Sequence, residues 1–391
     1  MPTNDSVGPS PLAGGVTPIS VAERQGRLEK ARRLMADSGI GAMYLETGSS
    51  LLYFTGILWG PSERMLAAII PARGEIAYIC PAFEEARLRE MILLGRDVRV
   101  WEEQESPYAL VASVIRDRCE AAGRIGIEES VRFFLFDGLR RELPQAEFVS
   151  ADPVTIPCRS IKSSAEIALM QKAMDVTVEA YRRCIPLLRE GMRPEEFSAL
   201  SAAAHKATGA EGGIGVQFGV ATAFPHGSKE PTTLHAGDVV LMDGGCAVEG
   251  YRSDISRTIV FGEPTRRQRD VWNVEKEAQA AAFAAAQVGA ACEAADAAAR
   301  RVIEKAGFGP GYKLPGLPHR TGHGIGLDVH EWHHLVCGNR TPIRPGMCFT
   351  NEPMIAIHGE FGVRLEDCMH ITEGGPRFFT QPSPSIEQPF A

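Results

Sequence analysis

Two stretches of the chain are expected to fold back on themselves, and each carries a pair of acidic residues. Residues 238–262, DVVLMDGGCAVEGYRSDISRTIVFG, predict two strands joined at a VEG turn. With the turn centred between Val248 and Glu249, Asp243 and Asp254 lie opposite one another. Two carboxylates that face each other at a buried edge repel unless a cation joins them. The first hairpin therefore indicates a cation site.

The second stretch, residues 347–372, repeats this arrangement in MCFTNEPMIAIHGEFGVRLEDCMHIT. Glu352 and Glu366 are symmetric about Gly359, so we expect them side by side on adjacent strands. Two divalent ions ~3.5 to 4 Å apart require such a set of oxygen ligands. The glycine-flanked segment GHGIG adds His323 as the imidazole ligand.

Each aspartate of the first pair also has a simpler interpretation. Asp243-Gly244 is a dipeptide that can itself form a hairpin turn, although the apolar residues on both sides favour a continuous strand. Asp254 alone can cap an element or face solvent. A second pair built in the same way argues for a shared function.

The segment GHGIGLDVHEWHH contains a competing motif. Residues 330–334 match H-E-x-x-H, the signature of single-zinc proteases in which two helical histidines bind the metal. His330 and His334 would then be ligands, Glu331 the base and Glu352 a third ligand. The glycines before this string and Gly338 after it leave too short a helix. We therefore interpret the match as a coincidence.

The rest of the sequence predicts an α/β protein of two domains. Alternating helices and strands, starting with a helix over residues 22–39, fill the first domain, 1–160, whose residues 1–18 are expected to be flexible. A Ser-Ser-x-Glu capping signal then starts a helix expected to run from residue 163 to Gly191. In the second domain, 161–391, one helix is expected over residues 193–209. A third, Ala-rich helix is expected within residues 266–306.

Composition narrows the possible partners. A content of 44% hydrophobic and 23% charged residues is typical of a soluble globular protein. The net charge is -8 and the sequence has no basic stripe, which argues against a nucleic-acid partner. The sequence also has no run of eighteen apolar residues, so we predict no membrane span. Nine cysteines without a C-x-x-C pair, Cys119 among them, indicate a reducing compartment. We expect a cytoplasmic protein and a homodimer.

Four segments, MDGGCAVEGYRSDISRT, HRTGHGIGLDVHE, FTNEP and GVRLEDC, resemble in order and spacing the catalytic domain of the pita-bread metallopeptidases. This family includes prolidase, aminopeptidase P, methionine aminopeptidase and the related creatinase. The two-domain layout is similar to the prolidase, aminopeptidase P and creatinase branch and covers nearly the whole chain. The resemblance implies an N-terminal creatinase/prolidase-like α/β domain and a C-terminal pita-bread α+β catalytic domain.

The resemblance also implies a metal site with five ligands. Asp243 and Asp254 would bind metal, with Asp254 bridging. His323 and Glu352 would bind the first metal, and Glu366 would bridge both. Creatinase, which works without metal, does not retain this set. We expect two divalent ions per chain, manganese first, with zinc or cobalt as alternatives.

Further residues receive roles from the same resemblance. Glu352 is expected to be the general base. His226 would line the substrate pocket, although a loop histidine taken alone is often simply solvated. His330 would contact the substrate carbonyl, or else support a carboxylate. Arg364 lies on the same strand face as Glu366 and can orient a ligand, contact substrate or balance charge.

The predicted activity is hydrolysis of the bond before proline in short Xaa-Pro peptides, by a hydroxide held between the two metals. The alternative is a hydrolase or lyase of a small non-peptide compound on the same fold. Ectoine hydrolase, creatinase and dimethylsulfoniopropionate lyase are examples. Many relatives continue after DVHE with a proline-containing turn, whereas this chain reads WHHLVCGN, which bears on specificity.

Overall fold

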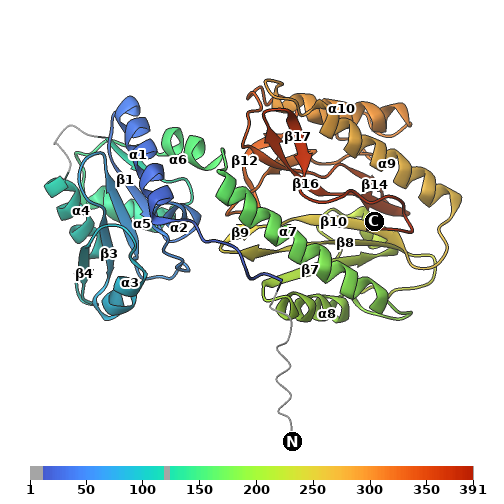
Figure 1. Cartoon of the computed structure of the whole chain (residues 1–391), viewed down its shortest axis with the longest axis horizontal. Helices are drawn as coiled ribbons and strands as arrows, with labels where there is room; N and C mark the ends of the chain where they lie inside the picture. Colours follow the sequence, from blue (N-terminus) through green and yellow to red (C-terminus); the bar gives the residue numbers. More distant parts are fainter. Residues whose placement is uncertain (1–11, 119–123, 391) are drawn as a thin grey trace, which may run out of the picture. The chain divides into compact units, whose positions relative to one another are not determined.

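The computed structural model describes residues 12–118 and 124–390, which form two compact units (Figure 1). The N-terminal unit spans Ile19–Arg159, and the second unit contains residues 160–390. Residues 12–18 group with the second unit, in which the Ala13 amide donates to the Thr208 carbonyl at 2.9 Å. The expected flexible start falls largely on residues 1–11, which, like Cys119, lie outside the described residues. Within that described part, no helix is long and apolar enough to cross a membrane.

The N-terminal unit is a six-stranded mixed sheet with strand order β4-β3-β2-β1-β5-β6. Its central strands are buried along their length, which is expected for a sheet covered by helices on its faces. The first helix starts where the Ser20 hydroxyl accepts the Glu23 amide at 3.1 Å. It ends, as predicted, at Gly39, whose φ of 66° suits glycine. The elements are α1 (Val21–Ser38), β1 (Ile40–Glu46), α2 (Ser49–Thr55), β2 (Ala67–Pro71), β3 (Ala77–Pro81), α3 (Glu85–Met91), β4 (Asp97–Trp101), α4 (Pro107–Arg118), β5 (Arg124–Ile127), α5 (Phe133–Glu142), β6 (Phe148–Ser150) and α6 (Asp152–Arg159).

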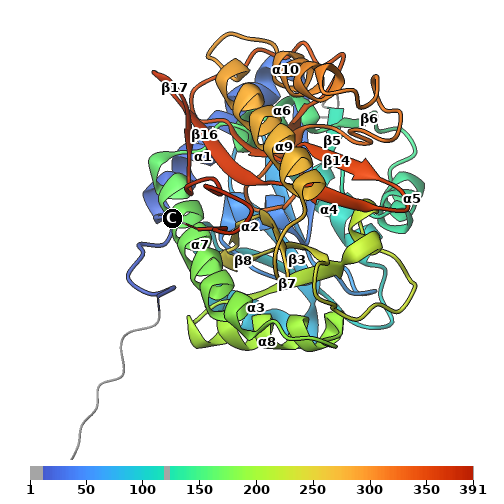
Figure 2. The ribbon, with the colours of Figure 1, turned by 90° about the vertical axis from the view of Figure 1, so that its right-hand side faces the viewer.

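In the second unit, strands lie between two pairs of helices (Figures 1 and 2). Helices α7 and α8 pack on β8 and β7, while α9 and α10 pack on the strands that follow them. The elements are α7 (Ser164–Cys184), α8 (Pro194–Ala207), β7 (Glu211–Phe218), β8 (Val239–Val248), β9 (Tyr251–Arg252), β10 (Ile255–Val260), α9 (Arg266–Ala285), α10 (Cys292–Lys305), β11 (Gly322–Gly324), β12 (Glu331–Leu335), β13 (Cys348–Asn351), β14 (Met354–Ile357), β15 (Phe361–Arg364), β16 (Asp367–Thr372) and β17 (Gly375–Phe378).

Two helix predictions need correction. The capping box formed by Ser163 and Glu166 starts α7 as expected, but the helix ends at Cys184 and not at Gly191. Pro186 has no amide hydrogen for the next helical bond, so the chain continues as a short 3-10 turn. The Ala-rich segment forms two helices, α9 and α10, because the chain reverses between them through Gly289 at a φ of 84°.

The strands of the second unit form two larger sheets that meet at one point. Strands β10, β8 and β7 form the first sheet, with β9 paired to β8, and the second has the order β12-β11-β13-β16-β17. An antiparallel bridge joins Ser256, in β10 of the first sheet, to Glu366, which directly precedes β16 of the second sheet. A third, two-stranded sheet of β14 and β15 carries the chain between β13 and β16. The predicted acidic residues are distributed around this junction.

The register of the first hairpin differs from the prediction. Val248 pairs with Tyr251, so the turn is Glu249-Gly250, where both residues have positive φ, 51° and 86°. Such a two-residue turn matches the twist of the flanking strands. Asp243 consequently pairs with Ser256, two residues beyond the predicted partner Asp254.

The second hairpin has the predicted symmetry. Ile357 pairs with Phe361 on either side of the turn at Gly359, whose φ is 83°. Asn351 pairs with Asp367 in the same register farther from the turn. Glu352 and Glu366 therefore occupy mirror positions, where each strand of the hairpin passes from one sheet to the next.

Candidate metal centre

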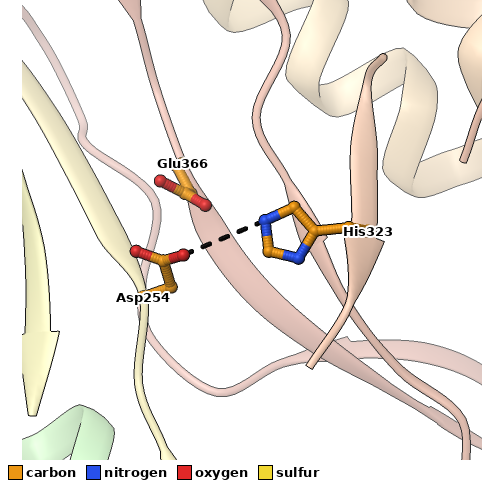
Figure 3. A group of neighbouring side chains, drawn as sticks. All are labelled: Asp254, His323 and Glu366. Atoms are coloured by element: carbon orange, nitrogen blue, oxygen red, sulfur yellow. Dashed lines mark ion pairs between the residues drawn. The ribbon is translucent and has the colours of Figure 1, made fainter. Parts of the chain in front are cut away.

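Three of the five predicted ligands converge on one point. Asp254 precedes β10, His323 is the middle residue of β11 and Glu366 lies between β15 and β16. One ligand atom from each residue lies within 4.8 Å of the others. Their side chains point toward one another from three separate segments of the chain (Figure 3). The spacing suits a cation with oxygen and nitrogen ligands.

Local hydrogen bonds set the orientation of His323. Its Nδ1 lies 3.0 Å from the Gly324 carbonyl oxygen, and because a carbonyl only accepts, Nδ1 carries the proton. Nε2 is left facing the carboxylates, 3.0 Å from Glu352 Oε1 and 3.9 Å from Asp254 Oδ2. The Thr350 hydroxyl accepts a hydrogen bond from the His323 backbone amide and donates one to Glu352 Oε1 at 3.1 Å. This is the arrangement that a metal-binding imidazole needs.

The site holds more negative charge than its own residues compensate. Burial, together with Asp243 and Glu352, raises the pKa of Asp254 well above its usual value. Burial and the same kind of repulsion, chiefly from Asp254, raise the pKa of Glu366, and its buried Oε1 has no hydrogen-bond partner among the described residues. A bound divalent cation removes both penalties at once, because it attracts the ionised carboxylates and satisfies the free oxygen. The residues therefore fit a metal.

Glu352 behaves differently from the other two carboxylates. Burial alone would raise the pKa of Glu352, but the hydrogen bond and charge of His323, when its Nε2 is also protonated, lower it to about 2. The side chain is therefore ionised at neutral pH, the form that can bind a cation or accept a proton.

Asp243 borders the cluster through Arg364 and Ser256. Arg364 Nη2 lies 2.7 Å from Asp243 Oδ2, and its Nε donates to the Ser256 hydroxyl at 3.0 Å. Ser256 Oγ is 3.0 Å from Asp243 Oδ1 and 2.7 Å from Glu366 Oε2. Burial alone would lower the pKa of Arg364, but Asp243 and the nearby carboxylates raise it. Arg364 therefore contacts Asp243, which is one of the predicted ligands.

The predicted substrate histidines lie next to this cluster. The rings of His330 and His323 are 4.2 Å apart. His226 and His330 both line a cavity of about 200 Å³ that reaches the cluster. The complete lining is Pro225, His226, His319, Arg320, His323, His330, Glu352 and Arg364.

The HEWHH string is not a helical zinc motif. Residues Glu331–Leu335 form strand β12, so His330 and His334 are not one helical turn apart. Glu331 is committed elsewhere: it forms an ion pair with Lys162 at 2.9 Å, both side chains being almost fully buried. It also accepts the amide of Leu327 at 3.0 Å. The zinc-protease alternative is therefore wrong.

Sequence reasoning missed two residues at this site. Ser256 became visible only with the correct register of β8 and β10, which pairs it with Asp243. Arg320 lines the cavity that also contains His226 and His330. Because the sequence has 41 lysines and arginines, its residue type alone does not single it out. Its position three residues before His323 was the available signal.

Comparison with known proteins agrees with this geometry. Residues 168–373 match the pattern of Metallopeptidase family M24, and residues 27–161 match the Creatinase/Prolidase N-terminal domain. The chain belongs to the M24 metallopeptidase family. The predicted family and fold class are confirmed, and membership of this family implies divalent metal ions.

Individual relatives extend over both units. The chain is 34% identical over 365 residues to a Xaa-Pro dipeptidase of Lactobacillus helveticus, covering 90% of this chain and 96% of the relative. Prolidase from Thermococcus sibiricus has a TM-score of 0.86 at 30% identity, covering 94% of this chain and 98% of that structure. Dipeptidase PepE from Mycobacterium ulcerans has the same TM-score and identity, with 96% and 100% coverage.

Proposed function

We propose that this M24 protein is a Xaa-Pro dipeptidase of the prolidase type. The observation that carries the proposal is the convergence of Asp254, His323 and Glu366 at the junction of two sheets. It occurs in a chain similar along most of its length to proteins named Xaa-Pro dipeptidase and prolidase. A non-peptide hydrolase or lyase on this fold remains the alternative to be tested.

The proposed metal ligands are the five predicted residues, Asp243, Asp254, His323, Glu352 and Glu366. Three of them form the cluster, while Asp243 and Glu352 adjoin it through Ser256 and His323. Two ions, with manganese first in view of the oxygen-rich set, are the proposed complement. When bound, such ions polarise the scissile carbonyl and lower the pKa of water.

The protein residues would share the remaining work. Glu352, ionised at neutral pH, would accept the proton of the attacking water. Burial and the neighbouring His323 lower the pKa of His330, so it is neutral and can donate a hydrogen bond to the carbonyl oxygen. His226 would contact the substrate from the opposite loop, and Arg364 would hold Asp243 in place.

The decisive experiment compares substrates on chelated protein reloaded with manganese. Ala-Pro should be hydrolysed, and Ala-Ala should be hydrolysed far more slowly because the pocket would be shaped for a ring and a tertiary amide. Ectoine and creatine test the alternative function. Equal turnover of Ala-Ala and Ala-Pro would reject the Xaa-Pro assignment, and turnover of ectoine or creatine alone would reject the peptidase.

Three further features belong to this proposal. Manganese is tested by reloading with manganese, zinc or cobalt and comparing activity. A cytoplasmic location is supported by the cysteines, because all eight in the described residues are free thiols. The homodimer stays a prediction that analytical ultracentrifugation can check.

A further inference from the structure

Asp254, one of the proposed metal ligands, lies in a short segment outside the strands. Ser253 and Asp254 fall between β9 and β10 and belong to neither. The Asp254 carboxylate is turned toward His323 and Glu366 (Figure 3). Its backbone carbonyl accepts a hydrogen bond from the Cys368 thiol at 3.2 Å. Because a ligand must be held within roughly 0.5 Å of its working position, contacts to this segment bear directly on metal binding.

Helix α7 directs two hydroxyl groups at the residues on either side of Asp254. The Tyr181 hydroxyl donates to the Ile255 carbonyl at 2.6 Å. Thr177 Oγ1 lies 2.8 Å from Ser253 Oγ, with either oxygen able to donate. Tyr181 and Thr177 are both 0% exposed, so solvent water does not replace either hydrogen bond. The helix therefore fixes the chain both before and after the ligand.

The spacing of the two hydroxyls matches the spacing of their partners. Thr177 and Tyr181 are four residues apart, which places them on the same face of α7. Four residues of a helix rise ~6 Å. Their partners, Ser253 and Ile255, are two residues apart, and two residues of an extended chain span ~6.6 Å. One face of α7 can thus bond to both residues without distorting either element.

We propose that Tyr181 is a positioning residue for the metal centre, with Thr177 as its helper. This role rests on the proposed function, because it requires Asp254 to bind a metal ion. Tyr181 acts through the backbone from which the Asp254 side chain extends. Without the hydroxyl, the carboxylate samples more positions, and ordering it again opposes metal binding.

The test measures the manganese affinity of the chelated full chain, from the electron paramagnetic resonance signal of free Mn²⁺ during a titration. Tyr181→Phe removes only the hydroxyl and should weaken binding about 10-fold, the lower end of the range for residues that support metal ligands. Thr177→Val should weaken it less, since Thr177 contacts a side chain and not the backbone. The double variant should bind more weakly than either. At saturating manganese, kcat for Ala-Pro should stay within about threefold of wild type.

A matched control is Tyr78→Phe in the N-terminal unit. Tyr78 is also 0% exposed, and its hydroxyl donates to the Leu94 carbonyl at 2.7 Å. This variant loses an equivalent hydrogen bond, so its free energy of unfolding should fall by a similar amount while its manganese affinity stays that of the wild type.

Two results would overturn the role of Tyr181. One is wild-type affinity in both Tyr181→Phe and the double variant. The other is an equal loss of affinity in Tyr78→Phe, because the effect would then follow general stability. A wild type that binds no manganese would reject the proposed metal site and this role with it. Failure to hydrolyse Ala-Pro would reject the proposed function, whereas the affinity measurements would still decide the role of Tyr181.

Discussion

Two consecutive acidic residues, Glu366 and Asp367, lie in opposite kinds of buried environment. Asp367 forms an ion pair with Arg257 at 2.7 Å, both side chains being fully buried, and Gln279 donates to its second oxygen at 3.1 Å. Glu366 faces other carboxylates, and one of its oxygens has no partner among the described residues. The balanced pair holds the strands together, whereas the unbalanced cluster is suited to bind a cation. A group of buried carboxylates that the protein's own cations do not fully balance therefore favours a metal site, whereas a fully paired one does not.

The largest effect should come from breaking the unbalanced cluster. Glu366→Gln and His323→Ala should lose bound metal and reduce kcat/KM by more than ~100-fold, the upper range for residues that only support ligands. Metal analysis and Ala-Pro hydrolysis measure both. Wild-type metal content in either variant would contradict the site.

The metal-free form of Glu366→Gln sharpens the comparison. The raised pKa of Glu366 means that its ionised form costs folding free energy, so stability is full below about pH 4.5 and is lost as the pH rises toward the folded value. The neutral glutamine removes that cost. Without metal, the variant should therefore resist urea better than the wild type at neutral pH.

Breaking the balanced pair should give the opposite result. Arg257→Met leaves Asp367 buried without its cation and should lower the free energy of unfolding by about 3–5 kcal/mol. The folded fraction should still bind metal. Urea unfolding combined with metal analysis distinguishes this outcome from loss of the site, and an unchanged unfolding midpoint would contradict the interpretation.

Glu331→Gln tests the second balanced pair with a smaller change. Lys162 loses its counter-charge, but the amide oxygen can still accept the hydrogen bond from Leu327. We expect a loss near the lower end of about 3–5 kcal/mol, with metal content retained. Loss of metal at wild-type stability would reverse the conclusion that Glu331 is a structural residue.

The smallest effect concerns His334, whose buried Nδ1 has no partner in the described part of the chain. Burial lowers the pKa of His334 to about 4, so the folded protein favours the neutral ring. Its contribution is full above pH 6.5 and is lost as the pH falls toward 4, by less than ~2 kcal/mol since the ring is partly exposed. His334→Gln should flatten the stability curve in this range and keep bound metal.

Much of the site followed from sequence because its residues are ordered by local symmetry. Glu352 and Glu366 are equally far along the chain from the turn at Gly359, and the strand pairs near to and farther from that turn keep the same register. Asp243 was harder to place. When the turn shifts by one residue, the partner of Asp243 on the opposite strand changes by two. The turn depends on a positive φ at Glu249, and a residue other than glycine gives no clear sequence signal for that conformation.

Sequence by itself determined the residue types of the candidate metal site, the two acidic hairpins and the start of α7. Hydrophobic alternation and capping act over a few neighbouring residues, so the sequence records them locally. Only the tertiary structure decided which charges are balanced. Arg257 meets Asp367, Lys162 meets Glu331, and Arg364 meets Asp243 across more than 100 positions of sequence. Such pairings depend on how the sheets and helices pack, and local sequence carries no record of that distance. The same packing leaves the Oε1 atom of Glu366 without a hydrogen-bond partner among the described residues.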